Sequence, residues 1–294
     1  MARLFHEVPS APSLFQNCLV EPEEARSILR PQRDERLGLG FTLSPYRGCA
    51  HGCRYCYVRE YPNALHSQEE WGGWIAPKLN APELLWSQRH RLHNATVFLS
   101  TATDPYQPIE REHRLTRACL KILLELATPR VVVHTRSALV LQDLDLLREF
   151  GNRLSVGFSI PTDDDTVRQV VEPKAPPIPT RWAAVERLAR GGIDVGLAVT
   201  PLMPMDNIQA FARRAASSGA SSAWVGRLRL LERDPFLGVL KDHGWERILE
   251  ADYAEEVRQA VQREIPQGLR PQRRPPTPPR PALPRVQNQQ PCLF

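Results

Sequence analysis

Residues 44–59 read SPYRGCAHGCRYCYVR and hold three of the chain's six cysteines, Cys49, Cys53 and Cys56. Three sulfurs at C-x3-C-x2-C spacing converge on one centre only if their loop curls around it, and the two glycines of the stretch give the backbone that freedom. A tetrahedral zinc site usually needs four protein ligands, whereas a [4Fe–4S] cluster held by three thiolates keeps one iron open. The spacing therefore predicts a metal site and leaves both kinds of site possible.

The other cysteines, Cys18, Cys119 and Cys292, have no partner at ligand spacing, so the fourth ligand of a zinc site would be His51 or a distant residue. The N-terminal stretch lacks the continuous apolar segment of a secretory signal, and no run approaches the ~18 apolar residues of a membrane span. We therefore expect a cytoplasmic protein with no membrane partner, whose thiols stay reduced. A disulfide framework explains the clustered cysteines less well than a metal site does.

The charge of the chain is concentrated at one end. The formal net charge is +5, from 38 basic and 33 acidic residues. Residues 265–294 hold five arginines, nine prolines and no acidic residue, so the rest of the chain has 33 residues of each sign. A segment so rich in proline forms neither helix nor central strand, and we expect a disordered or polyproline-like tail. The neutral remainder gives little electrostatic support for nucleic-acid binding.

Short β-rich runs alternate with amphipathic stretches through most of the chain. The β-rich runs are residues 41–48, 96–103, 130–137, 154–160, 193–200 and 222–230. The helical patterns between them are residues 82–94, 111–127, 139–151, 180–192 and 207–219. Such repeats predict parallel strands with right-handed crossovers. We expect an α/β fold, a partial (β/α)6 barrel of the TIM type, although a doubly wound sheet fits the same alternation.

The alternation divides the chain into four segments. We expect an N-terminal leader over 1–40, the partial barrel over 41–232, C-terminal helices over 233–264 and the disordered tail over 265–294. Chemistry in such barrels gathers at the carboxyl ends of the strands. The three-cysteine loop follows the first predicted strand, so it lies at the end where a site is expected.

The cysteine spacing, with the aromatic Tyr55 before the last cysteine, resembles the signature of the radical S-adenosylmethionine (SAM) enzymes. Further stretches, together covering about residues 40–232, resemble the spore photoproduct lyase-like, or DNA repair photolyase, branch: PYRGC, 100–110, 134–137, 158–177 and 196–207. The resemblance implies a six-stranded partial barrel, a [4Fe–4S] cluster on the three cysteines and SAM on the open iron. It also implies reductive cleavage of SAM to a 5′-deoxyadenosyl radical, driven by an electron donor such as flavodoxin or ferredoxin.

Two strand ends carry SAM contacts that the resemblance implies. Thr103 and Asp104 end the second predicted strand, where the superfamily contacts the SAM amino group. Arg136 ends the third, where a cation would pair with the SAM carboxylate. Each position also has a purely structural interpretation. Asp104 precedes a proline and would cap a turn, and Arg136 would pair with a surface acid.

Three further residues complete the implied SAM site. Ser159, on the fourth strand, would reach the ribose or the carboxylate, and Thr200, on the fifth, lies where the adenine is usually held. Tyr55 would pack on the adenine. A satisfied strand hydroxyl is the structural alternative for Ser159.

The chain departs from the lyase at one position. The lyase that repairs spore DNA keeps a hydrogen-donating cysteine just before its SAM site, and this chain has Thr101 there, a far poorer hydrogen-atom donor. Cys119 lies on the apolar face of its helix and is interpreted as core. The resemblance points to a lyase that acts on a nucleic-acid lesion or base. Without the cysteine, either another hydrogen donor serves or the substrate differs from that of dimer reversal.

Two alternatives remain open at this stage. One is radical modification of a peptide or a small molecule. The other is a protein that binds an iron–sulfur cluster or zinc structurally and is not an enzyme. We expect a monomer, since a radical barrel that closes over its substrate needs no second subunit.

Overall fold

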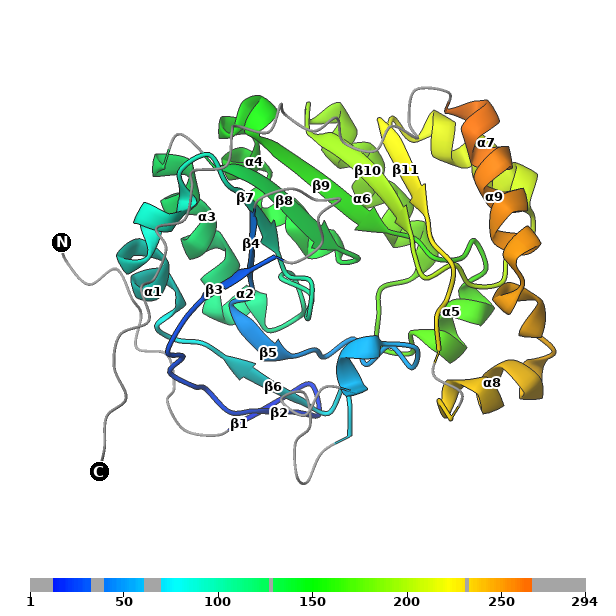
Figure 1. Ribbon diagram of the computed structural model, residues 1–294, viewed down its shortest axis with the longest axis horizontal. Helices are drawn as coiled ribbons and strands as arrows, with labels where there is room; N and C mark the ends of the chain where they lie inside the picture. Colours follow the sequence, from blue (N-terminus) through cyan, green and yellow to red (C-terminus); the bar gives the residue numbers. More distant parts are fainter. Residues whose placement is uncertain (1–12, 33–39, 61–69, 127–128, 231–232, 266–294) are drawn as a thin grey trace, which may run out of the picture.

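The computed structural model describes residues 13–32, 40–60, 70–126, 129–230 and 233–265 (Figure 1). Its main sheet has the strand order β11-β10-β9-β8-β7-β4-β3. Six of these strands are parallel: β4 (Gly40–Leu43), β7 (Thr96–Leu99), β8 (Arg130–Thr135), β9 (Leu154–Ser159), β10 (Asp194–Val199) and β11 (Ser222–Val225). They follow one another in the sheet as they do in the chain. A doubly wound sheet reverses its order at a switch point, so the unbroken order supports the predicted barrel type of winding.

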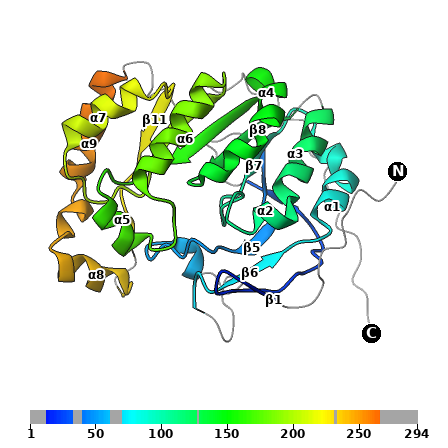
Figure 2. The same cartoon turned by 180° about the vertical axis from the view of Figure 1, so that it is seen from behind.

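A helix follows each parallel strand further along the chain. These helices are α1 (Ala81–Ser87), α3 (Leu115–Glu125), α4 (Leu144–Glu149), α6 (Ile178–Arg190), α7 (Ile208–Ser217) and α9 (Ala251–Glu264). Figure 2 shows α3, α4 and α6 lying over one face of the sheet. The six β/α pairs confirm the predicted repeat. Because α9 packs against α7 and β11, the sixth helix of the barrel comes from the segment predicted as a separate C-terminal extension.

The parallel strands do not close on themselves in the described part of the chain. There β11 pairs only with β10, and at the other edge β3 (Leu29–Pro31) pairs antiparallel with β4. The main core lies between the sheet and its outer helices. On β9, Val156 and Phe158 belong to that core, so Ser155 and Gly157 face the inner side of the sheet.

The predicted strand over 41–48 is in fact two strands. β4 ends at Leu43, and β5 (Tyr46–Gly48) begins after Pro45, which has no N–H to continue a ladder. β5 joins a second sheet of order β1-β2-β6-β5, with β1 (Ser13–Phe15), β2 (Cys18–Val20) and β6 (Trp74–Pro77). The segment predicted as a leader therefore supplies strands to both sheets.

Shorter elements complete the fold. They are α2 (Glu110–His113), α5 (Asp165–Val171), α8 (Phe236–His243) and the 3-10 helices η2 (Tyr57–Glu60), η4 (Arg89–Leu92), η5 (Ala138–Asp143), η6 (Gly151–Arg153) and η7 (Glu246–Leu249). The C-terminal helices were predicted, whereas α5 lies outside the predicted helical patterns. The predicted tail lies beyond the described residues except for Ile265. Within the described ranges, no helix combines the length and the apolar character needed to cross a membrane.

The two faces of β9 can be tested with one pair of variants. Phe158→Ala removes a fully buried ring, and we expect it to lower the free energy of unfolding by about 3–5 kcal/mol. Ser155→Ala, on the inner face, should change it by less than about 0.5 kcal/mol. Denaturant unfolding followed by circular dichroism measures both, and equal losses would contradict the assignment of the faces.

Candidate functional site

The three-cysteine loop leaves β5 and runs into η2 beneath the carboxyl ends of the parallel strands (Figure 1). Cys49 and Cys53 are buried, Cys56 is half-buried, and none is in a disulfide. Gly48 and Gly52 have positive φ angles of 73° and 56°. These are left-handed conformations that favour glycine, so the predicted curl of the loop is present.

The thiols influence one another electrostatically. Burial raises the pKa of Cys49 to about 12 and raises the pKa values of Cys53 and Cys56 as well, and the other two thiols both act on Cys53. Without a metal the loop therefore carries protonated thiols at neutral pH, and metal binding must displace their protons. Within the described ranges, no three His, Cys, Asp or Glu side chains are grouped tightly enough to hold one metal ion. Three thiolates are the ligand set of a [4Fe–4S] cluster with one open iron, whereas a tetrahedral zinc ion needs a fourth protein ligand.

A glycine pair supports the back of this loop. Gly72, in the turn before β6, has φ 94° and lies so close to Gly52 that a Cβ there would be 2.6 Å from the Gly52 Cα. The Lys174 ammonium donates to the Gly72 carbonyl at 2.8 Å, from the loop after α5. The cysteine loop is thus enclosed between the turn before β6 and the loop after α5.

The segment after β7 holds the front of the loop. The Thr103 hydroxyl donates to the Gly48 carbonyl at 2.6 Å and accepts from Gln107 Nε2 at 3.1 Å. Gln107, fully buried, also accepts from the Ala50 N–H at 2.9 Å through Oε1. Thr103, implied as a SAM contact, here fixes the backbone beside Cys49.

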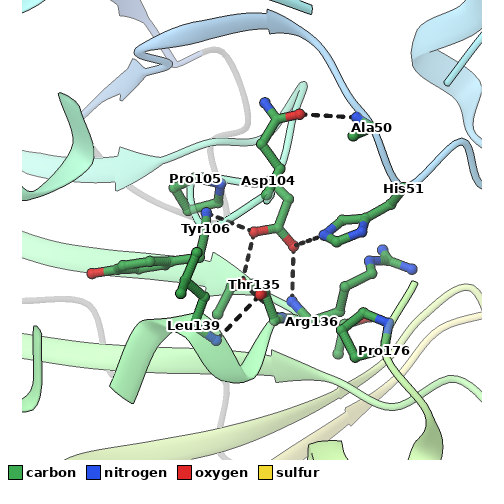
Figure 3. A network of polar contacts seen from close by, with 12 residues as sticks. Ala50, His51, Asp104, Pro105, Tyr106, Thr135, Arg136, Leu139 and Pro176 are labelled. Atoms are coloured by element: carbon green, nitrogen blue, oxygen red, sulfur yellow. Dashed lines mark hydrogen bonds and ion pairs between the residues drawn. The ribbon is translucent and has the colours of Figure 1, made fainter. Parts of the chain in front are cut away.

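Asp104 joins this segment to the next strand and to the cysteine loop (Figure 3). Its Oδ1 accepts from the Thr135 hydroxyl at 2.7 Å and the Tyr106 N–H at 2.9 Å, and its Oδ2 accepts from the Arg136 N–H at 2.9 Å. His51 Nε2 lies 3.5 Å from Oδ2. Burial alone would raise the Asp104 pKa, but His51 and the donors lower it to about 2. Both carboxylate oxygens are engaged with protein groups, so the contact with the SAM amino group stays a prediction.

Glu172 is the centre of a buried charged group beside Cys53. Its carboxylate is fully buried, pairs with both Arg136 and Arg181, and accepts from the Tyr55 hydroxyl. Arg136 Nη1 also donates to the Tyr55 oxygen at 2.9 Å. Burial would raise the Glu172 pKa, but the two guanidinium groups outweigh it and lower the pKa to about 2. We call Glu172, Arg136, Arg181 and Tyr55 the Glu172 network.

The Glu172 network also reaches the end of β9. Arg181 Nη1 donates to the Ser159 carbonyl at 3.3 Å, and Arg181 Nε donates to the Pro176 carbonyl at 2.8 Å. The Ser159 hydroxyl has no hydrogen-bond partner among the described residues. Three of the predicted SAM contacts, Tyr55, Arg136 and Ser159, are therefore linked through this one network.

Thr200 lies apart from the network, at the end of β10. Thr200 is half-buried, and its hydroxyl packs closely on Gly226. A Cβ added to Gly226 would lie 2.5 Å from the Thr200 Oγ1. Trp224, on the inner face of β11 beside it, is 53% exposed. His134, on the inner face of the central strand β8, is also exposed. Because β8 has a neighbouring strand on each side, His134 can be exposed only if the inner face of the sheet is open to solvent. The inner wall is therefore accessible.

The C-terminal part covers the other side of the cysteine loop. The Tyr55 ring meets Phe236 of α8 edge to face, with centroids 6.0 Å apart and planes at 73°. Arg59 of η2 pairs with Asp234, whose Oδ1 also accepts from the Phe236 N–H at 2.8 Å. These contacts fix the start of α8 against the loop.

The position of the lyase cysteine is occupied by an exposed residue. Thr101 lies in the loop after β7, and its carbonyl accepts from the Tyr57 hydroxyl at 2.8 Å. Cys119, in contrast, is fully buried in the core on α3, as predicted. Neither residue offers an accessible thiol.

Several residues of the site were missed in the sequence. Gln107 and Glu110 follow Asp104 at intervals of three, and Glu110, fully buried, accepts from the Tyr46 hydroxyl at the start of β5. Arg181 occupies a core position of its helix, three residues after buried Ile178. A charged residue on an apolar helix face was the signal that a buried partner existed.

Comparison with known proteins agrees with this geometry. The sequence profile of the radical SAM superfamily matches residues 43–215. An uncharacterized protein of Methanocaldococcus jannaschii is 30% identical over 167 residues, which cover 57% of this chain and 62% of that protein. An uncharacterized protein of Acidianus two-tailed virus is 28% identical over 205 residues, covering 65% of each chain. The chain thus spans less than two thirds of the length of these curated relatives.

Among solved structures, the chain is similar to a spore photoproduct lyase variant with bound AdoMet and dinucleoside spore photoproduct. The TM-score is 0.61 at 16% sequence identity, and the match covers 85% of this chain and 79% of that one. A second spore photoproduct lyase variant matches with the same score and coverage. At this identity the likeness concerns the fold, and it supports the partial barrel.

The glycine contact behind the cysteine loop predicts a local defect. In Gly72→Ala the new Cβ meets backbone at a left-handed position, so we expect a loss of about 2 kcal/mol in the free energy of unfolding. Iron bound per chain after reconstitution should fall as well. Gly238→Ala, in α8 with no neighbouring atom within 4 Å of its Cβ, is the matched control. It should be neutral or stabilise by up to about 1 kcal/mol, and equal behaviour of the two variants would refute the contact.

The buried Glu172 carboxylate predicts a pH dependence of stability. Its folded pKa of about 2 lies below the ordinary value of 4.5, so its ionisation stabilises the fold above pH ~4.5 and this contribution is lost as the pH falls towards ~2. The shift corresponds to about 3 kcal/mol. Glu172→Gln should therefore be less stable at pH 7 and lose less stability on acidification. The exposed Glu149→Gln should match the wild type in denaturant unfolding at each pH, and a Glu172→Gln curve parallel to the wild type would contradict the assignment.

Proposed function

The chain belongs to the radical SAM superfamily, and we propose that it is an enzyme that holds a [4Fe–4S] cluster through Cys49, Cys53 and Cys56 and binds SAM at the open iron. The observation that carries the proposal is the loop itself. Three reduced thiols lie in one enclosed loop at the carboxyl ends of the strands, without a fourth ligand among the described residues. His51, the candidate fourth ligand of a zinc site, lies against Asp104 instead, which disfavours the structural-zinc alternative.

The cluster and SAM, when bound, supply reductive cleavage of the sulfonium to a 5′-deoxyadenosyl radical. The protein's part is to bind and orient. Arg136 uses Nη1 on Glu172 and Tyr55, whereas its Nε and Nη2 have no hydrogen-bond partner in the described part of the chain. A guanidinium fork held on one side and open on the other suits a carboxylate, so we assign Arg136 to the SAM carboxylate. We assign the unpartnered Ser159 hydroxyl to the ribose or to the same carboxylate.

The surrounding elements would keep water from the reacting groups. Tyr55 is buried between Glu172 and Phe236, so α8 closes one side of the cysteine loop. Lys174 ties the loop after α5 to the turn before β6 and closes another. Exclusion of water prevents side reactions of a reactive intermediate.

A nucleic-acid base or base lesion is the substrate class that we propose. Its support is the exposed indole of Trp224 on the inner wall, since base stacking on an aromatic side chain is worth about 1–3 kcal/mol. Thr101 offers no thiol where the lyase has one, so we propose a hydrogen donor or a product other than in dimer reversal. A flavodoxin or ferredoxin would supply the electron, and the chain would act as a monomer.

SAM cleavage is the first test of this function. The protein is purified without oxygen, reconstituted with iron and sulfide, and incubated with dithionite and SAM, and 5′-deoxyadenosine is measured by chromatography. We expect the wild type to form 5′-deoxyadenosine, and so should the control Cys119→Ala, which removes a thiol from the core. Cys53→Ala removes a direct ligand of the cluster, so its yield should fall by at least about 100-fold. No nucleoside from a fully loaded wild type would reject the proposed enzyme and favour a structural cluster.

A further inference from the structure

The Glu172 network lies directly beside Cys53 and carries a net positive charge. Arg136 and Arg181 each contribute a positive charge, and Glu172 contributes one negative charge. The network is attached to the loop at two points. Tyr55, two residues after Cys53, donates to Glu172, and the Arg54 N–H donates to the Val171 carbonyl at 2.9 Å. The backbone directly after Cys53 is thus held against the residues around Glu172.

The position of the charge matters because an iron–sulfur cluster changes its charge when it is reduced. Three thiolates on an oxidised [4Fe–4S] core give a net negative charge, and the incoming electron makes it more negative. Net charge and burial around a cluster set its reduction potential, and a charge acts strongly at short range in a buried site. A cation near the sulfurs therefore favours the reduced form, and an anion there favours the oxidised form.

Arg136 is the cation best placed for this effect. Its Nη1 donates to the hydroxyl of Tyr55, the residue directly before Cys56 and two residues after Cys53. Glu172 accepts from the same hydroxyl and has the opposite charge. Asp104 lies on the Cys49 side, where His51 faces it. The two sides of the loop thus have different charges, and the positive one is next to Cys53.

We propose that the Glu172 network sets the reduction potential of the cluster bound at Cys53, with Arg136 favouring the added electron and Glu172 limiting that effect. The step is the gain of one electron by the cluster from a low-potential one-electron donor, with no proton or bond change in the protein. The inference rests on the proposed function, because it needs the cluster. It adds to Arg136 a role that is independent of SAM.

The test is a potentiometric titration of the reconstituted protein without SAM, monitored by the electron paramagnetic resonance signal of the reduced cluster. Arg136→Gln should shift the midpoint potential to more negative values, and Arg136→Lys, which keeps the charge, should restore most of it. Glu172→Gln should shift the midpoint in the opposite direction. A loss of packing alone would not give opposite shifts from the two partners of one ion pair.

Two controls separate charge from disturbance of the loop. Tyr55→Phe breaks the hydrogen bonds of the network without changing its charge and should shift the midpoint less than Arg136→Gln. Arg214→Gln removes a charge paired with Glu186 on the outer helices α6 and α7, and should leave the midpoint unchanged. If Glu172→Gln does not fold, the Arg136→Gln and Arg136→Lys pair decides the question, because Glu172 keeps Arg181 as its partner in both.

The outcomes distinguish the inference from the function on which it rests. A wild type that takes up iron and sulfide but gives no reduced-cluster signal would overturn the proposed function, and the inference with it. A normal signal whose midpoint is the same in the wild type, Arg136→Gln and Arg136→Lys would overturn the inference alone. Shifts of the same sign in Arg136→Gln and Glu172→Gln would also overturn it.

Discussion

The site depends on one buried carboxylate. Glu172 is fully buried and pairs with Arg136, directly after β8, and with Arg181 of α6. A buried charge that loses its partner costs several kcal/mol, so the three side chains must occupy their places together. Because Tyr55 donates to the same carboxylate, the requirement extends to the cysteine loop. The cysteine loop thereby acquires a defined position at the ends of the strands.

The residues after β7 work in the same way on the other side of the loop. Thr103, Gln107 and Asp104 each contact a residue of the loop or the strand beside it. Superfamily resemblance implies that Thr103 and Asp104 contact SAM, yet in this fold both already hold protein groups. A residue that positions the site and a residue that contacts the ligand cannot be distinguished in a sequence, because both are polar and follow a strand. Only the partners of each side chain tell the two roles apart.

Short-range sequence patterns predicted most of the fold, whereas long-range contacts could not be predicted from them. The six strands and the outer helices follow from apolar runs and helical periodicity, and the cysteine loop follows from spacing. The split of 41–48 at Pro45, the strands within 1–40 and the role of α9 depend on pairing partners distant in the chain. The same holds for the site: Glu172 is 36 residues from Arg136 and 117 from Tyr55. Only Arg181, a charge on an apolar helix face, gave a local sign of a buried partner.

In an incomplete barrel, the outer face of the sheet packs against the helices and stabilises the protein, while the inner face is available for a binding site. In a closed eight-stranded barrel the interior is packed with branched apolar side chains. Here the apolar faces of the strands pack outward against the helices, while the inner wall carries Ser155, Gly157, His134 and the exposed Trp224. His134 lies across Gly157, where a Cβ would be 2.7 Å from its ring, so even the glycine leaves room for a polar side chain. The exposed residues of that wall can therefore change with the substrate, whereas the contacts of Glu172 and Asp104 that hold the cysteine loop cannot.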